Sequence, residues 1–416
     1  MSAAKPFEIS KISVMEAYKR VKANDGSAGV DGQSIEDFEK DLKGNLYKIW
    51  NRMSSGCYFP PPVKAVAIPK KSGGERILGV PTVADRVAQM VVKSHFEPLV
   101  EPIFHEDSYG YRPGKSAHQA LAITRKRCWR YDWLLEFDIR GLFDNIPHDL
   151  LLKALRKHTD CKWTLLYVER WLKAPLQKPD GMLIPRDKGT PQGGVVSPVL
   201  SNLFLHYVFD AWMAKHHPAI PFARYADDGL LHCVSEKQAR YFKDKLENRF
   251  KECGLELHPT KTKIVYCKDE IRKKDYVNTT FVFLGYEFRP RLSYSKKNDK
   301  YFVNFSPGVS RAALTDFRDT MRSWKLHLRS DKSLQDLANM FNPVIQGWVN
   351  YFGRFYPSAM NPSLRHINLV LEKWARRKYK RLERHRRQSG YWLGRVAQKN
   401  PRMFVHWRLG KLPTVG

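Results

Sequence analysis

Two adjacent aspartates, Asp227 and Asp228, stand between two short apolar runs and are followed by Gly229. Asp and Gly tolerate the positive φ angles of tight hairpins, so the pattern predicts two carboxylates at the tip of a β-turn. Taken alone, such a turn is more often a plain solvated hairpin than a metal site. A third carboxylate, Asp138, lies near the end of the apolar run 133–139. A carboxylate in such a strand is costly unless it is paired or bound to a metal ion.

The segments between these aspartates predict that they meet. A glycine- and proline-rich loop at 189–198 opens an apolar helix over 199–212, and the strands of 222–234 follow. This order predicts one sheet with Asp138 and the aspartate pair on neighbouring strands. Clustered carboxylates without His or Cys favour a hard cation such as Mg²⁺. Two such ions about 4 Å apart can activate a 3′-hydroxyl and stabilise a departing pyrophosphate.

A basic hairpin precedes these motifs. Strands are predicted over 63–68 and 76–81, with lysines and glycines in the turn between them, and a helix is predicted to start at Thr82. Such a hairpin can clamp a triphosphate, although a solvated turn is the commoner role of this pattern. The stretch 108–117 mixes aromatic and basic residues, which suits either contact with nucleic acid or an irregular loop packed on the core.

The rest of the chain is predicted to be mainly helical. The region 7–50 is predicted to be helical, with a capping box that starts at Ser34. Polar connectors are predicted at 268–280 and 290–300, with a domain boundary near 290–308. Further helices are predicted over 148–158, 236–253, 310–328, 333–356 and 361–388, and strands over 255–266 and 281–288.

The composition favours a polyanionic partner. The 416 residues carry 72 Lys and Arg against 42 Asp and Glu, a net charge of +30. Nucleic acid is the leading candidate, and an anionic membrane surface is the alternative. No apolar run reaches transmembrane length, and the six cysteines lack metal-site spacing, so we expect reduced thiols in the cytoplasm. Nine of the fifteen residues in 373–387 are Lys or Arg, which predicts either a solvated or a phosphate-contacting helix.

Several motifs in order resemble those of reverse transcriptases, and specifically the proteins encoded by bacterial group II introns. They include the segments 137–144 (FDIRGLFD), 190–194 (TPQGG) and 225–228 (YADD), and 347–352 (GWVNYF) is similar to the maturase thumb, or X, domain. The resemblance implies an α+β right-hand polymerase: an N-terminal extension (1–57), fingers and palm (58–289) and a helical thumb (309–416). The lack of an endonuclease extension before Gly416 resembles the compact class-C intron proteins.

The resemblance also implies roles for individual residues. Metal ligands would be Asp138, Asp227, Asp228 and the Ile139 carbonyl, with Mg²⁺ as the cofactor. The nucleotide would be bound by Lys70, Arg76, Phe143 as the ribose gate, Gln192 and Lys261, and nucleic acid by Arg112, Tyr225, Arg376, Arg377, Lys378, Lys380 and Arg381. The partners implied are an RNA template, group II intron RNA, a DNA primer or target, and deoxynucleoside triphosphates. The implied function is RNA-directed DNA synthesis with intron splicing and mobility; a maturase with vestigial polymerisation and a domesticated defence enzyme are the alternatives.

Overall fold

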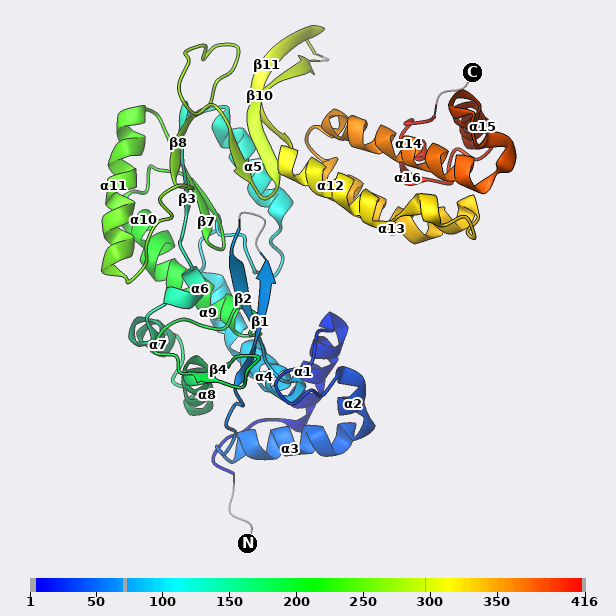
Figure 1. The fold of residues 1–416 in the computed structure, drawn as a ribbon. Coiled ribbons are helices and arrows are strands. Elements are labelled where there is room, and N and C mark those ends of the chain that lie inside the picture. The colour runs from blue at the N-terminus through cyan, green and yellow to red at the C-terminus, as the bar shows by residue number, and fades with distance from the viewer. Residues whose placement is uncertain (1–4, 70–72, 296, 414–416) are drawn as a thin grey trace. The chain divides into compact units, whose positions relative to one another are not determined.

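The computed structural model describes residues 5–69, 73–295 and 297–413. The chain divides into two compact units, one formed by Met1–Ala120 with Leu135–Ile264 and the other by Leu121–Leu134 with Val265–Gly416. Helices alternate with small, mainly antiparallel sheets (Figure 1), which confirms the predicted α+β class. Within the described ranges, no helix combines the length and the apolar character needed to cross a membrane.

The first unit begins with three helices, α1 (Lys11–Asn24), α2 (Ile35–Lys40) and α3 (Leu42–Ser54). The predicted capping box is confirmed, because the Ser34 side chain accepts from the Asp37 amide and the Asp37 carboxylate accepts from the Ser34 amide. Such reciprocal bonds satisfy two amides that a helix start leaves unpaired. The N-terminal helical region is thus formed as its sequence indicates.

The predicted basic hairpin is also present. Strands β1 (Val63–Pro69) and β2 (Glu75–Val80) pair antiparallel and form the sheet β2-β1-β4-β5 with β4 (Leu176–Gln177) and β5 (Leu183–Ile184). Helix α4 (Val83–Val100) follows, with Thr82 as its N-cap, as predicted. The 3₁₀ turn Glu101–Ile103 and helix α5 (Ala117–Cys128) complete this part of the chain.

A second sheet, ordered β6-β7-β3-β8, carries the predicted aspartates. Its strands are β3 (Trp133–Asp138), β6 (Phe222–Tyr225), β7 (Asp228–Cys233) and β8 (Lys263–Tyr266). Phe137 packs against Phe209 and Phe250, which anchors β3 to the helices beside the sheet. The strand predicted over 255–266 is formed only at Lys263–Tyr266, apart from one isolated bridge between Leu257 and Ile139.

The other helices of this unit are α6 (Leu142–Asn145), α7 (His148–Arg156), α8 (Lys162–Lys173), α9 (Ser197–Leu205), the π-helix His206–Asp210, α10 (Ala211–His216) and α11 (Glu236–Glu252). Helix α7 begins at His148, as predicted, with Pro147 as its N-cap, and ends at Arg156 rather than at 158. The helix predicted over 199–212 is interrupted by the π-helix, a feature often found at functional sites.

The second unit contains a hairpin where a connector was expected. Strands β10 (Tyr286–Ser295) and β11 (Lys300–Val309) pair along their whole lengths, and β9 (Phe281–Phe283) adds to β10. The prediction of a polar connector at 290–300 is therefore wrong, and the boundary predicted near 290–308 falls on this hairpin. The pairing buries Phe288 and Phe305. These apolar positions stabilise the hairpin despite the charged residues around them.

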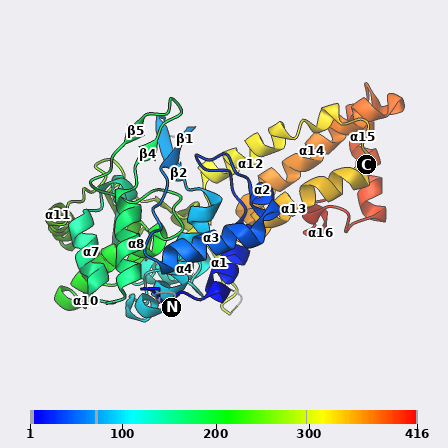
Figure 2. The ribbon, with the colours of Figure 1, turned by 90° about the horizontal axis from the view of Figure 1, so that it is seen from below.

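Helices form the rest of the second unit: α12 (Arg311–Ser323), the 3₁₀ turn Leu326–Leu328, α13 (Leu334–Phe352), the 3₁₀ turn Pro357–Met360, α14 (Asn361–Lys378), the 3₁₀ turn Lys380–Leu382, α15 (Arg386–Lys399) and α16 (Val405–Arg408). These helices are drawn in yellow to red in Figures 1 and 2. Their core includes Trp374 and Trp407. The single helix predicted over 361–388 is broken, because Tyr379 is extended after α14 ends at Lys378 and the separate helix α15 begins at Arg386.

Candidate active site

The three aspartates are gathered at one corner of the β6-β7-β3-β8 sheet. Asp138 is the last residue of β3, and Asp228 is the first residue of the neighbouring strand β7. Tyr225 pairs with Asp228 in the β6–β7 hairpin, so Ala226 and Asp227 form its two-residue turn. Asp138 and Asp228 are close enough to share a hydrogen bond between their side chains. The predicted hairpin and the neighbouring strand placement are both confirmed.

Burial makes it energetically costly for these carboxylates to be charged at the same time. Burial, followed by the charges of Asp227 and Asp138, raises the pKa of Asp228 to about 7. Burial is also the main cause that raises the pKa of Asp227, and the charge of Asp138 adds to it. Like charges removed from water repel strongly unless a cation lies among them. The cluster thus has the electrostatic character of a cation site.

Asp138 already has one positive partner. Its Oδ2 accepts from Lys261 Nζ at 2.9 Å, and its backbone carbonyl accepts from the His258 amide at 2.7 Å. The bridge between Ile139 and Leu257 consists of this bond and a second one, from the Arg140 amide to the Glu256 carbonyl. The Ile139 carbonyl takes part in neither bond. The ligand role of that carbonyl stays a prediction.

Among the described residues, no group of three or more His, Cys, Asp or Glu is arranged so that it could hold a metal ion with the side chains as they stand. The donor chemistry nevertheless fits a hard divalent cation, since Asp138 and Asp228 adjoin, Asp227 lies within electrostatic reach, and all three supply oxygen. Lys261 supplies positive charge to Asp138 in the structure, and a bound metal would compete with that ammonium group for the same oxygen.

The backbone of the turn is not the one that its sequence suggests. The left-handed residue is Ala226, with φ of 57°, rather than Asp or Gly229. A Cβ built on Gly229 would lie 2.0 Å from the Phe137 ring, so this glycine is required for close packing between β7 and β3. An alanine in the left-handed region costs about 1 kcal/mol or more, so surrounding contacts must hold the turn.

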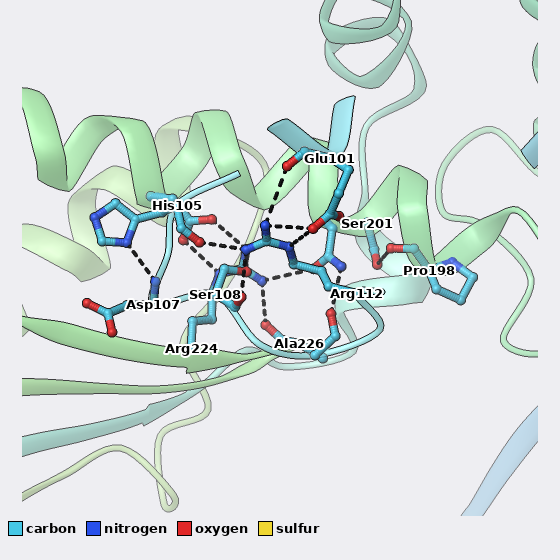
Figure 3. A network of polar contacts seen from close by, with 12 residues as sticks. Glu101, His105, Asp107, Ser108, Arg112, Pro198, Ser201, Arg224 and Ala226 are labelled. Carbon is cyan, nitrogen blue, oxygen red and sulfur yellow. Dashed lines mark hydrogen bonds and ion pairs between the residues drawn. The ribbon is translucent and has the colours of Figure 1, made fainter. Parts of the chain in front are cut away.

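A buried arginine provides those contacts (Figure 3). Arg224 Nε and Nη2 donate to the two oxygens of Asp210 at 2.8 and 2.6 Å, and Nη1 donates to the Ala226 carbonyl at 3.0 Å. Further bonds reach Asn202 Oδ1 at 3.2 Å and Ser108 Oγ at 2.8 Å. All five N–H groups are therefore used. The guanidinium ties the metal-site turn to α9, the π-helix and the segment before α5.

Arg112 fixes that segment from the other side (Figure 3). Its guanidinium pairs with Glu101 and donates to the carbonyls of His105 and Ser108 at 2.6 and 2.7 Å. Gly110 then packs on the turn, because a Cβ there would lie 2.5 Å from the Ala226 amide. Arg112 thus supports the turn in this structure, and its predicted contact with nucleic acid stays a prediction.

Two of the nucleotide-binding candidates lie at a cavity of about 240 Å³. Phe143 and Gln192 both line it. Gln192 Nε2 donates to Asp144 Oδ2 at 3.1 Å, and the Gln192 carbonyl accepts from the Gly79 amide on β2 at 2.8 Å. Arg76 on β2 lies within electrostatic reach of Asp227, where its charge opposes the rise that burial causes in the pKa of that carboxyl. The structure thus places Phe143 and Gln192 at one cavity and Arg76 within electrostatic reach of Asp227, while Lys70 lies outside the described residues.

The predicted thumb contacts divide into two kinds. Lys378 Nζ donates to the carbonyls of Ser330 and Lys332, and Arg376 donates to Ser389 Oγ at 3.0 Å, so both serve the fold of the second unit. Arg377, Lys380 and Arg381 are exposed. These three remain the predicted phosphate contacts of the basic segment.

Arg224 and Asp210 support the site but were not predicted from the sequence. A usable signal exists in the sequence: each is a charged residue within an apolar segment, 222–225 and 199–212 respectively. Buried charges of opposite sign require partners, so the two residues could have been paired.

Comparison with known proteins identifies the family. The model described as reverse transcriptase (RNA-dependent DNA polymerase) matches residues 68–288, and that of the group II intron maturase-specific domain matches 314–392. Protein YkfC of Escherichia coli K12 is 30% identical over 312 residues, 64% of this chain and 77% of that protein. The group II intron-encoded protein LtrA of Lactococcus lactis is 34% identical over 194 residues, 46% of this chain but only 32% of LtrA. The chain belongs to the reverse transcriptase family and carries a group II intron maturase-specific domain.

Proposed function

We propose that this protein synthesises DNA on an RNA template with Mg²⁺ as its divalent cofactor. The observation that carries the proposal is the convergence of Asp138, Asp227 and Asp228 at one sheet corner, and a cavity lined by Phe143 and Gln192 adds support to it. A bound pair of Mg²⁺ ions supplies activation of the primer 3′-hydroxyl and charge stabilisation at the leaving pyrophosphate. The three carboxylates and the Ile139 carbonyl would hold these ions.

The other residues bind and orient the substrates. Arg76, together with Lys70, would contact the triphosphate of a deoxynucleoside triphosphate, and Gln192 would line its pocket. The Phe143 ring would exclude a ribose 2′-hydroxyl by its volume. Lys261 lies at Asp138, where it can neutralise charge near the primer end. Most of the rate enhancement in such a site comes from positioning and electrostatics rather than from covalent chemistry.

Primer extension tests this assignment. Asp227→Asn keeps the side-chain shape but removes a charged ligand, and we expect it to abolish extension of a DNA primer on an RNA template in Mg²⁺. Asp244→Asn, an exposed carboxylate on α11, is the matched control and should extend normally. Extension by Asp227→Asn at the parent rate would rule out the catalytic assignment.

We further propose that the protein binds intron RNA to assist splicing and intron mobility. This second role is supported by the maturase-specific match at 314–392 and by the exposed cations of the basic segment. RNA binding needs no catalytic metal, so Asp227→Asn should still promote splicing of the intron RNA. The triple variant Arg377→Gln/Lys380→Gln/Arg381→Gln should splice poorly; parent-level splicing by this variant would rule out these three contacts.

A further inference from the structure

A groove on the first unit lies apart from the aspartate corner, between α7, the π-helix with α10, and α11. Figure 2 shows α7, α10 and α11 on the same side of this unit. The groove consists of two adjoining hollows of about 380 and 600 Å³, which share Arg249 and Glu252 in their walls. We call it the α7–α11 groove. Its other lining residues are Leu150, Lys153, Ala154, Lys157, Phe204, Tyr207, Val208, Trp212, Lys245, Asn248, Lys251 and Cys253.

The charge of this groove is strongly positive. Its walls carry four lysines and Arg249 against a single carboxylate, Glu252. Among the residues that the structure describes, no carboxylate lies within ion-pair distance of Lys153, Lys157 or Lys251. Surface lysines usually gain a little stability from pairing with nearby acids. Cations left unpaired around a hollow are suited to binding an anionic ligand.

The groove also has a fixed aromatic wall. Tyr207 belongs to the π-helix; its hydroxyl bonds His158 Nε2, and Lys157 Nζ lies 4.8 Å from its ring centroid. Arg249 donates to the carbonyls of Tyr207 and Val208 at 3.1 and 3.0 Å, and these two bonds hold the backbone of the π-helix in place. Each bond fixes the ring or its backbone. The tyrosine is therefore preorganised rather than freely rotating.

We propose that the α7–α11 groove binds a single-stranded RNA segment. Unpaired bases would pack on Tyr207 and the apolar floor formed by Ala154 and Phe204, while the lysines contact phosphates. Interleaved aromatic and basic residues are the features that bind single strands, because every base has a stacking face and every nucleotide a phosphate. Duplex RNA buries its base faces, so it cannot present one to the smaller hollow.

This site is independent of DNA synthesis. None of the groove residues belongs to the aspartate corner or to the cavity lined by Phe143 and Gln192. Loss of the metal ligands should therefore leave RNA binding in the groove intact. For this reason all measurements use the full chain with Asp227→Asn as the parent, so that catalysis cannot change the probe.

Photocrosslinking tests the proposal. A single-stranded RNA of about 12 nucleotides containing 4-thiouridine is crosslinked to the parent, and the linked peptides are mapped. We expect crosslinks within residues 204–212 and 249–253. The variant Lys153→Gln/Lys157→Gln should reduce this yield at least fivefold and lower the salt slope of binding by about 1.4, since each lost phosphate contact contributes about 0.7.

Two controls distinguish loss of RNA binding in the groove from the effect of removing positive charge elsewhere and from misfolding. Lys237→Gln/Lys243→Gln removes the same charge from α11 away from the groove lining, and it should crosslink like the parent. Tyr207→Ala should lower the yield 5- to 100-fold, whereas Tyr207→Phe keeps the ring and should retain it. Absence of crosslinks in the two peptides, or equal losses from both lysine pairs, would overturn the proposal.

Discussion

The guanidinium of Arg224 and the carboxylate of Asp210 form a bidentate ion pair in which both side chains are fully buried. The same guanidinium donates to the carbonyl of Ala226, the residue before the first aspartate of the turn. A buried pair of this kind contributes little net stability compared with apolar packing, but removal of one partner is costly. Its importance here is geometric, because it fixes the backbone that carries Asp227.

Arg224→Lys should therefore impair catalysis more than substrate binding. Lysine keeps the charge but cannot bridge Asp210, Ala226 and Ser108 at once. We expect steady-state primer extension to show kcat reduced by up to about 100-fold, with KM for the nucleotide little changed, because misplacement of a ligand by about 1 Å has effects of this size. Arg170→Lys, which replaces another arginine that donates to backbone carbonyls, is the control and should be near normal. Equal losses in both variants would contradict the positioning role.

Phe143→Ala should weaken discrimination against ribonucleotides. Phe143 lines the same cavity as Gln192, and loss of its ring leaves space for a 2′-hydroxyl. We expect the ratio of kcat/KM for deoxynucleotide over ribonucleotide to fall about 10- to 200-fold, as is typical when a pocket loses one steric contact. Single-nucleotide incorporation on an RNA template measures it. Phe143→Tyr retains the ring and should discriminate normally; an unchanged ratio in Phe143→Ala would remove the gate role.

Gly229→Ala should destabilise the first unit and slow DNA synthesis. The new methyl group would overlap the Phe137 ring, and such overpacking costs about 1–3 kcal/mol. Urea unfolding measures the loss, and Phe137→Leu in the same chain should restore part of it. Gly347→Ala is the matched control: its Cβ would meet nothing within 4 Å and it lies inside α13, so it should be neutral or stabilising. Unchanged stability in Gly229→Ala would refute the close contact.

Acid should destabilise the second unit through His406. This residue is fully buried, its Nε2 bonds Asn368 Oδ1 at 2.7 Å, and burial lowers its pKa to about 3. Because the folded state holds it neutral, its contribution is present above the unfolded pKa near 6.5 and is lost as the pH falls toward 3. Between pH 7 and 5 the loss is about 2 kcal/mol.

Urea unfolding of the full chain, followed by tryptophan fluorescence at pH 7, 6 and 5, measures this loss. His406→Gln can keep the bond to Asn368 without a titrating group, so its stability should vary less with pH by that amount. The same pH dependence in both proteins would exclude His406 as the cause.

Local patterns were enough to predict most of the elements that position the site. Thr82 and Ser34 could be identified as helix starts because capping depends on residues within one turn. Asp138 could be singled out because a carboxylate in an apolar strand needs a partner. The placement of Asp138 and the aspartate pair on neighbouring strands followed from the order of strands and helices along the chain.

The failures have a different physical origin. The left-handed backbone of Ala226 depends on Gly110 and Arg224, and no local propensity of alanine indicates it. The β10–β11 hairpin contains Pro290 and Pro307, which argue against a strand when they are considered alone. Long-range pairing outweighs these local preferences. Such tertiary effects cannot be recovered from short windows of sequence.

The bond between Lys261 and Asp138 joins residues 123 positions apart in the chain. During translation at about 5–20 residues per second, the lysine is made roughly 6–25 s after the aspartate. A nascent chain that stops before Lys261 also lacks the His258 amide that holds the Asp138 carbonyl. A product that ends between Asp228 and His258 would therefore carry all three aspartates but lack both contacts that hold Asp138.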